Sequence, residues 1–123
     1  MLPSFTGGFA PGGSLEGTYA HLANADEQTV REVKLLIDIG TKIETAVYLD
    51  ARAFPAGNNN LRVRMKLGVD WIEVASLTTT TVGAAEQVIS TLGPFKVDRD
   101  FRITIESAAV DFDVPWWLLW SRL

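Results

Sequence analysis

The clearest pattern in the chain is an alternation of apolar and basic residues over Leu61–Leu67. Apolar residues occupy every second position, and Arg62, Arg64 and Lys66 lie between them. Because successive side chains of a β-strand point to opposite faces, this pattern predicts a strand with one buried face and one basic, solvated face. The residues just before it are rich in Pro, Gly and Asn, which favour a turn. We therefore predict a hairpin in which Ile43–Phe54 pairs with Leu61–Leu67.

Similar patterns predict further strands along the chain. They lie at Val30–Ile39, Lys42–Phe54, Trp71–Leu77 with its extension Thr78–Thr81, Phe95–Val97 and Phe101–Val110. Between Gly83 and Leu92 the pattern leaves open one helical turn or a loop into a short strand. Many short strands separated by Gly, Pro and Asn turns predict an all-β fold, an antiparallel β-sandwich or small jelly roll. We expect the threonine row on a solvent-exposed edge, since β-branched residues favour extended backbone.

Two signals conflict in the region around the first predicted strand. Asn24 and Glu27 have the spacing of a capping box, which would begin a helix. The alternation from Val33 to Ile39 favours a strand, and we give it the greater weight because it is the longer signal. His21 is the single histidine of the chain, and we expect it to be a polar surface residue.

The N-terminal segment differs in composition from the rest of the chain. Five of the ten glycines lie in Met1–Gly17, which we therefore expect to be an extended arm without regular structure of its own. The segment also contains Phe5 and Phe9. Two interpretations are open: a partly disordered tail, or an arm that becomes ordered by placing these rings on a neighbouring subunit.

The C-terminal segment Pro115–Leu123 contains three of the four tryptophans. In a strand, Trp116 and Trp120 would point to one face, and Trp117 and Leu119 to the other, so both faces would be apolar. Burial of one Trp removes about 150–250 Å² from water, so this segment must be covered. It is either a central strand of the protein's own sandwich or an anchor on a neighbouring chain, where Trp is enriched among the residues that dominate binding.

Composition then narrows the classes of function. A chain of 123 residues is expected to form one sandwich, residues 18–114, between the arm 1–17 and the segment 115–123. The formal net charge of -4 argues against a nucleic-acid partner, and the absence of cysteine excludes disulfides. No apolar run reaches the roughly 18–20 residues that span a bilayer. The N-terminus shows no basic segment followed by an apolar stretch, so we expect no signal peptide and no membrane partner.

Candidates for chemistry are few. The pairs Asp98 with Asp100 and Asp111 with Asp113 could each place two carboxylates on one strand face, as a calcium site requires, but Arg99 is close enough to neutralise the first pair. No Gly-x-Ser-x-Gly sequence and no phosphate-binding Gly-rich loop before a helix are present. We predict no catalysis, no cofactor and no metal.

The basic face of Leu61–Leu67 is also a candidate for an acidic partner. We expect it to be neutralised instead by Glu44 and Asp50, which lie on the strand predicted to pair with it.

The combination of segments resembles small virion proteins of tailed bacteriophages. The features that carry the resemblance are the Gly-rich arm, the cysteine-free sandwich, the strand Trp71–Val74 with the threonine row after it, and the late strand Phe101–Ile105. The resemblance implies a structural role in the virion, as a capsid decoration protein or another head or tail component. It also implies that the partners are copies of the chain itself and other virion proteins, such as the major capsid protein.

The two apolar ends predict which residues make contacts between chains in such an assembly. We expect an interface that includes Phe5, Phe9, Trp116, Trp117, Leu119 and Trp120. The alternative is a carbohydrate-binding β-sandwich in which Tyr48, Trp71 or the C-terminal tryptophans stack on sugar rings.

Overall fold

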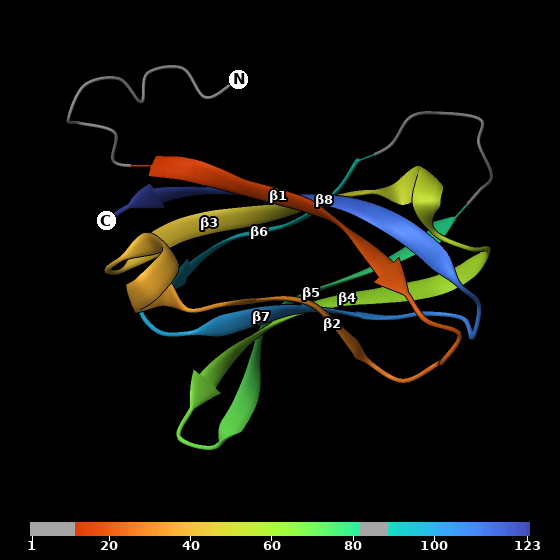
Figure 1. Cartoon of the computed structure of the whole chain (residues 1–123), viewed down its shortest axis with the longest axis horizontal. Coiled ribbons are helices and arrows are strands. Elements are labelled where there is room, and N and C mark those ends of the chain that lie inside the picture. Colours follow the sequence, from red (N-terminus) through yellow and green to blue (C-terminus); the bar gives the residue numbers. More distant parts are fainter. Residues whose placement is uncertain (1–11, 82–88) are drawn as a thin grey trace.

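The computed structural model describes residues 12–81 and 89–123. It is a sandwich of two four-stranded antiparallel sheets (Figure 1). Sheet A has the order β1-β8-β3-β6 and sheet B the order β2-β7-β4-β5. The strands are β1 (Gly12–His21), β2 (Gln28–Val33), β3 (Ile43–Asp50), β4 (Gly57–Leu67), β5 (Asp70–Thr81), β6 (Ile89–Val97), β7 (Phe101–Glu106) and β8 (Phe112–Arg122), with short helical turns η2 (Leu35–Ile39) and η3 (Ala51–Ala53). The predicted all-β sandwich is confirmed.

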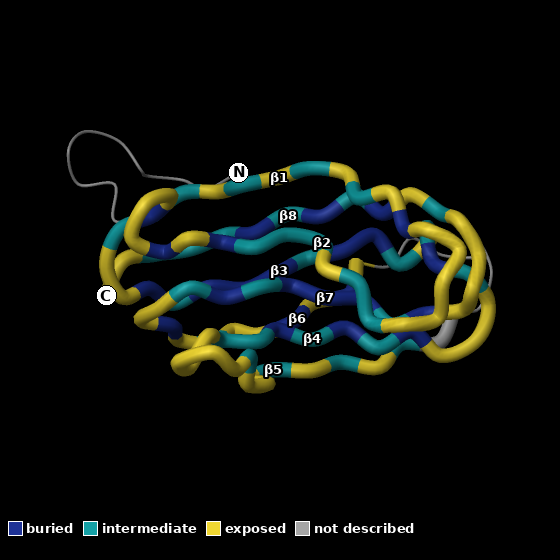
Figure 2. The backbone as a smooth tube through the Cα atoms, turned by 60° about the horizontal axis from the view of Figure 1, so that its bottom comes forward, coloured by how far each residue is buried: buried dark blue, intermediate teal, exposed yellow. Residues whose placement is uncertain are grey.

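The core lies between the inner faces of the two sheets. Its fully buried side chains include Val47 and Leu118 from sheet A and Val63, Phe101 and Ile103 from sheet B. The alternation in Leu61–Leu67 and in Phe101–Ile105 therefore predicted the buried faces of β4 and β7. Figure 2 shows the buried residues along the inner strands and the exposed ones in the connections at both ends. No helix among the described residues is long and apolar enough to cross a membrane.

The predicted pairing of Ile43–Phe54 with Leu61–Leu67 is wrong, because β3 and β4 lie in different sheets. The turn η3 separates them: the Asp50 carboxylate accepts a hydrogen bond from the Arg52 N–H at 3.0 Å, and Phe54 is buried in the core. This connection carries the chain from one sheet to the other. The hairpin partner of β4 is β5, and Gly68 in the turn between them has φ 64°, which favours glycine.

The predicted strand Val30–Ile39 is correct only in its first part. β2 ends at Val33, and Leu35–Ile39 form one π-helical turn. Two carboxylates hold this turn, because Asp38 accepts a hydrogen bond from the Lys34 N–H and Asp100 accepts one from the Leu35 N–H. No helix begins at the predicted capping box, whose Asn24 side chain accepts instead from the backbone N–H of Asp26 at 2.7 Å.

The predicted arm is wrong for residues 12–17, which belong to β1, whereas residues 1–11 lie outside the described residues. β1 pairs with β8 so that Gly13 lies opposite Trp120 and Gly17 opposite Trp116. A Cβ atom at either glycine would lie 2.9 Å from the indole Cζ2 of its partner. These glycines are therefore strand residues that leave room for tryptophan, rather than residues of a loop.

His21 is buried, which corrects the prediction of a surface residue. Its ring stacks on Phe112 with the centroids 4.4 Å apart, and its Nδ1 donates to the Val110 carbonyl oxygen at 3.0 Å. His21 and Phe112 are also cross-strand partners. The histidine therefore fastens the end of β1 to the start of β8.

Candidate interaction surfaces

The C-terminal strand occupies the middle of sheet A. β8 pairs with β1 on one side and with β3 on the other. Trp116 is 4% exposed, and Trp120 packs against the core at its margin. Residues 115–122 thus belong to a central strand of the protein's own sandwich, which is the first of the two predicted alternatives.

The other predicted interface residues have different positions. Trp117 and Leu119 are half-buried and lie on the outer face of sheet A, because side chains alternate along β8. Phe5 and Phe9 lie outside the described residues. Only part of the predicted set therefore shares one surface in the described part of the chain.

A wholly apolar groove crosses the outer face of sheet A. It is lined by Tyr48, Ile89, Trp117 and Leu119 and has a volume of about 320 Å³. Tyr48 lies directly opposite Trp117 in the register of β3 and β8. We call these four residues the sheet A groove.

A second hollow of about 250 Å³ continues the sheet A groove toward the start of β3. The two share Tyr48 and Leu119, and the second also includes Ala46 and Pro94. Its lining also includes Glu44, Thr45 and Ser121, so the wholly apolar part of this face is the sheet A groove itself.

The outer face of sheet B is charged instead, and the two arginines of β4 on it are paired with carboxylates. Arg64 donates to the Glu27 carboxylate from Nε at 2.6 Å and from Nη2 at 2.9 Å. Arg62 lies within 3.3–3.4 Å of Glu27, Glu73 and Glu106. Arg62 and Arg64 are therefore neutralised, but not by Glu44 and Asp50 as predicted, because those residues lie on β3 in the other sheet.

Glu27 is the acceptor at the centre of this network. The hydrogen bond from Arg64 is the largest effect that lowers its pKa, to about 2, and a hydrogen bond from the Thr104 hydroxyl at 2.6 Å acts in the same direction. Partial burial opposes the shift. Because Glu27 lies in the connection between β1 and β2, these contacts fasten that connection to sheet B.

Trp71, a predicted sugar-stacking residue, is covered. The Arg102 guanidinium carbon lies 3.7 Å from its ring centroid and Lys66 Nζ lies 5.7 Å from it. An Arg over an indole is a stabilising cation–π contact. The ring is therefore engaged within the chain.

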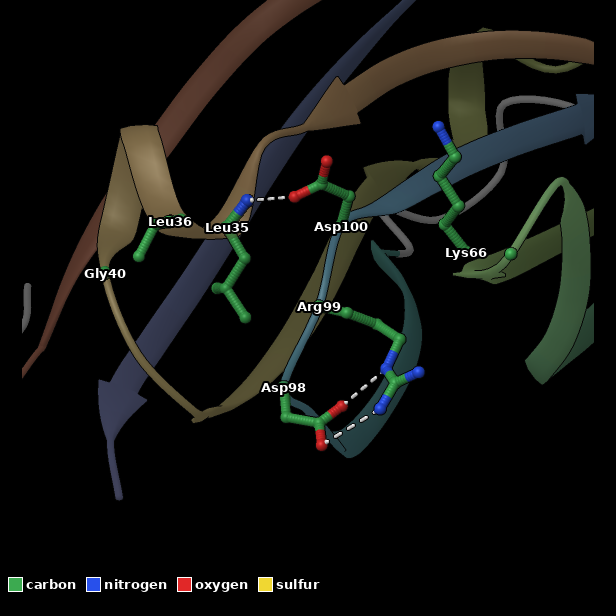
Figure 3. A pocket seen from close by; sticks show the side chains of 8 residues that line it. Leu35, Leu36, Gly40, Lys66, Asp98, Arg99 and Asp100 are labelled. Atoms are coloured by element: carbon green, nitrogen blue, oxygen red, sulfur yellow. Dashed lines mark hydrogen bonds and ion pairs between the residues drawn. The ribbon is translucent and has the colours of Figure 1, made fainter.

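A third hollow lies at the end of the sandwich near η2. It has a volume of about 440 Å³ and is lined by Leu35, Leu36, Gly40, Lys66, Gly68, Asp98, Arg99 and Asp100. Both of its carboxylates have partners within the chain (Figure 3). Asp98 forms an ion pair with Arg99 at 2.9 Å, and Asp100 accepts a hydrogen bond from the Leu35 N–H at 2.9 Å. The arginine near the first predicted calcium pair is thus a partner of Asp98.

The second carboxylate pair, Asp111 and Asp113, is exposed at the opposite end of the sandwich. Among the described residues, no group of three or more His, Cys, Asp or Glu side chains is placed to hold a metal ion. His21 is enclosed beside Phe112 and faces none of the three hollows.

Comparison with known proteins shows a similarity of fold to one solved structure. No family model matches the chain, and no curated protein matches it. Among solved structures, it resembles a chain from work on Bacillus endospore appendages, described as a novel family of disulfide-linked pili. The TM-score is 0.57 at 16% identity, over 91% of this chain and 88% of the other. At this identity the likeness shows a shared two-sheet fold.

Proposed function

We propose that the chain is a non-enzymatic structural subunit that assembles with copies of itself. The observation that carries this proposal is the sheet A groove, where Tyr48, Ile89, Trp117 and Leu119 leave an apolar surface without a partner in the described part of the chain. Patches rich in aromatic residues and poor in charge are typical of the centres of protein interfaces.

A second copy is the occupant that the surface fits best. The groove lies on the face of an antiparallel sheet. The residues opposite Trp117 and Tyr48 on the neighbouring strands are small or polar: Glu16 on β1 and Thr91 on β6. Such a face packs well against another sheet face. The shared fold with a chain from pili supports self-assembly, since those proteins are described as forming appendages.

The means of assembly must differ from that of the pili. The pili are described as disulfide-linked, whereas this chain contains no cysteine. Contacts between its copies therefore contain no disulfide, and we expect burial of the apolar groove to contribute to their free energy.

The proposal has two forms that differ in the particle built. In one, the subunit belongs to the virion of a tailed phage, where it contacts the capsid and assembles in the host cytoplasm; the sequence resemblance supports this form. In the other, it forms a fibre, which the fold of the pilus chain supports. Electron microscopy of the purified chain separates them: filaments from the chain alone favour the fibre, and binding only to purified capsids favours the virion.

The self-assembly proposal is tested by substitution on the two sheets. Trp117→Lys places a charge in the sheet A groove and is expected to lower the mass in solution below that of the wild-type assembly, because the contact through sheet A is lost. Val74→Lys changes an exposed apolar residue on β5 of sheet B and is the matched control. Light scattering measures both, with circular dichroism to verify folding. A wild-type chain that is monomeric at all concentrations would refute the proposal.

A second candidate function is carbohydrate binding, and one arrangement favours it. Tyr48 and Trp117 lie opposite each other, with Glu16 and Thr91 in the same rung of sheet A. Aromatic faces flanked by hydrogen-bonding side chains suit a sugar ring. A saccharide-dependent change in fluorescence that Trp117→Phe abolishes supports this function, and flat titrations with several polysaccharides exclude it for those sugars.

A further inference from the structure

The two ends of the sandwich differ from each other in shape and charge. One end, here the η2 end, comprises η2, the β4–β5 turn and the β6–β7 turn; it lies at the left of Figure 1. The other, the η3 end, comprises the β1–β2 connection, η3 and the β7–β8 connection. Both ends expose large apolar side chains. Clusters of exposed apolar side chains are typical of surfaces that bind another molecule.

The η2 end projects apolar residues around the third hollow. Leu36, Ile37 and Val69 are 79%, 81% and 90% exposed. Leu36 also forms part of the wall of the 440 Å³ hollow (Figure 3). The turn that presents Leu36 and Ile37 is fixed by the bonds to Asp38 and Asp100. This apolar surface is therefore built into the fold rather than carried on a loose loop.

The η2 end is also basic. Lys42, Lys66, Lys96 and Arg122 form no ion pair within the described residues, and the acids without an ion pair at this end are Glu44, Asp70 and Asp100. The remaining charges are matched, as in the pair of Asp98 with Arg99. An excess of positive charge thus surrounds Leu36 and Ile37.

The η3 end has the opposite charge. Asp26, Asp111 and Asp113 are exposed and form no ion pair in the part of the chain that the structure describes. Leu22 and Val110 are exposed beside them, Leu22 by 66%. Leu22 follows His21, which donates to the Val110 carbonyl, so these two apolar residues lie on adjoining connections.

We propose that copies of the chain associate end to end, with the η2 end of one copy seated on the η3 end of the next. Leu36 and Ile37 pack against Leu22 and Val110, and lysines of the η2 end face the carboxylates of the η3 end. This inference rests on the proposed self-assembly and specifies one of its contacts. Because the two patches are different, the contact is heterologous and repeats along a row of subunits instead of closing a symmetric dimer.

The partner is a second copy because the two ends complement each other in charge as well as in apolar character. Opposite charges at the rim of an apolar contact fix its orientation. They also disfavour contact between two ends that carry the same charge. Contact between two η3 ends would bring the unpaired carboxylates together. Head-to-tail order follows directly from the charge distribution.

A charge-swap experiment tests this contact in the full-length chain. Lys42→Glu with Lys66→Glu makes the η2 end acidic, and Asp111→Lys with Asp113→Lys makes the η3 end basic. Either variant alone meets like charges at every end-to-end contact. Each is expected to assemble only at a concentration at least about tenfold higher than the wild type. An equal mixture of the two variants restores complementary ends and is expected to recover wild-type assembly.

Controls separate this inference from the proposed function. Ser76→Glu and Ser76→Lys change the charge at mid-strand on sheet B and are expected to leave assembly unchanged. If the wild type never assembles, the proposed function fails, and the end-to-end contact fails with it. If the wild type assembles but both swap variants behave like it, only the end-to-end contact is overturned. The same conclusion follows if the variants fail alone and their mixture does not recover, since a misfolded variant is recognised by circular dichroism.

Discussion

The outer faces of the two sheets are built alike and used differently. Each belongs to a four-stranded antiparallel sheet. On sheet B, Arg62 and Arg64 are matched by carboxylates, and Arg102 covers Trp71. On sheet A, Tyr48 and Trp117 face outward in an apolar groove. Since the fold requires neither arrangement, the contrast lies in the sequence, and it is the reason for our proposal that sheet A is the face that binds.

The largest expected effect comes from comparing two adjacent tryptophans of β8. Trp116→Ala empties a site in the core and is expected to lower the free energy of unfolding by about 3–5 kcal/mol. Trp117→Ala removes an outer-face side chain and is expected to cost about 1 kcal/mol or less in the dissociated monomer. Urea denaturation under dissociating conditions measures both. Equal losses would contradict the assignment of the two residues to opposite faces.

A smaller effect is expected at the glycines of β1. Gly17→Ala places a Cβ 2.9 Å from the Trp116 indole, and the shift this forces is expected to cost about 1–3 kcal/mol. Ser14→Ala, at an exposed position of the same strand, is the matched control and is expected to change stability by less than about 0.5 kcal/mol. Thermal and urea unfolding check the difference. A neutral Gly17→Ala would show that the indole does not depend on the glycine.

The charged face of sheet B predicts a dependence on pH. Glu27 has a pKa of about 2 in the folded chain against an ordinary value of 4.5, so it stabilises the fold above pH 4.5 and this contribution disappears as the pH falls toward 2. The loss is at most about 3 kcal/mol, and solvent screening of the partly exposed carboxylate reduces it. Glu27→Gln is expected to flatten the stability curve in this window. An unchanged curve would contradict the role of Glu27.

The smallest effect concerns the cover on Trp71. Arg102→Ala removes the guanidinium 3.7 Å from the ring centroid and is expected to cost about 0.5–1 kcal/mol. Lys66→Ala, whose ammonium lies 5.7 Å away, is expected to cost less. Urea denaturation ranks the two variants. The reverse order would show that Lys66 carries the contact.

Strands with a regular alternation were predictable from local sequence, but their partners were not. Alternation in Leu61–Leu67 identified β4 and its buried face, because a period of two is a property of one strand. Its assignment to a hairpin with β3 failed, since η3 and the buried Phe54 move the chain to the other sheet. The prediction that Glu44 and Asp50 neutralise Arg62 and Arg64 was wrong for the same reason, because it assumed that β3 pairs with β4.

The two clearest errors at the chain's N-terminal side have one cause. Gly13 and Gly17 resemble loop residues until their tryptophan partners, about a hundred residues away, are placed opposite them. His21 resembles a surface residue until Val110 and Phe112 enclose it. The signal available in the sequence was that glycines and tryptophans both recur at a spacing of four residues, Gly13 with Gly17 and Trp116 with Trp120.

The central claim is that copies bury the outer face of sheet A, and the absence of cysteine allows a direct test. Thr91→Cys places a single thiol on that face, beside Tyr48, and Ser76→Cys places one on the outer face of sheet B, beside Arg62. The rate of maleimide labelling is measured for each variant in the assembled and the dissociated state. We expect assembly to slow labelling at position 91 strongly and to leave position 76 unchanged. Equal rates at position 91 in both states would contradict the account.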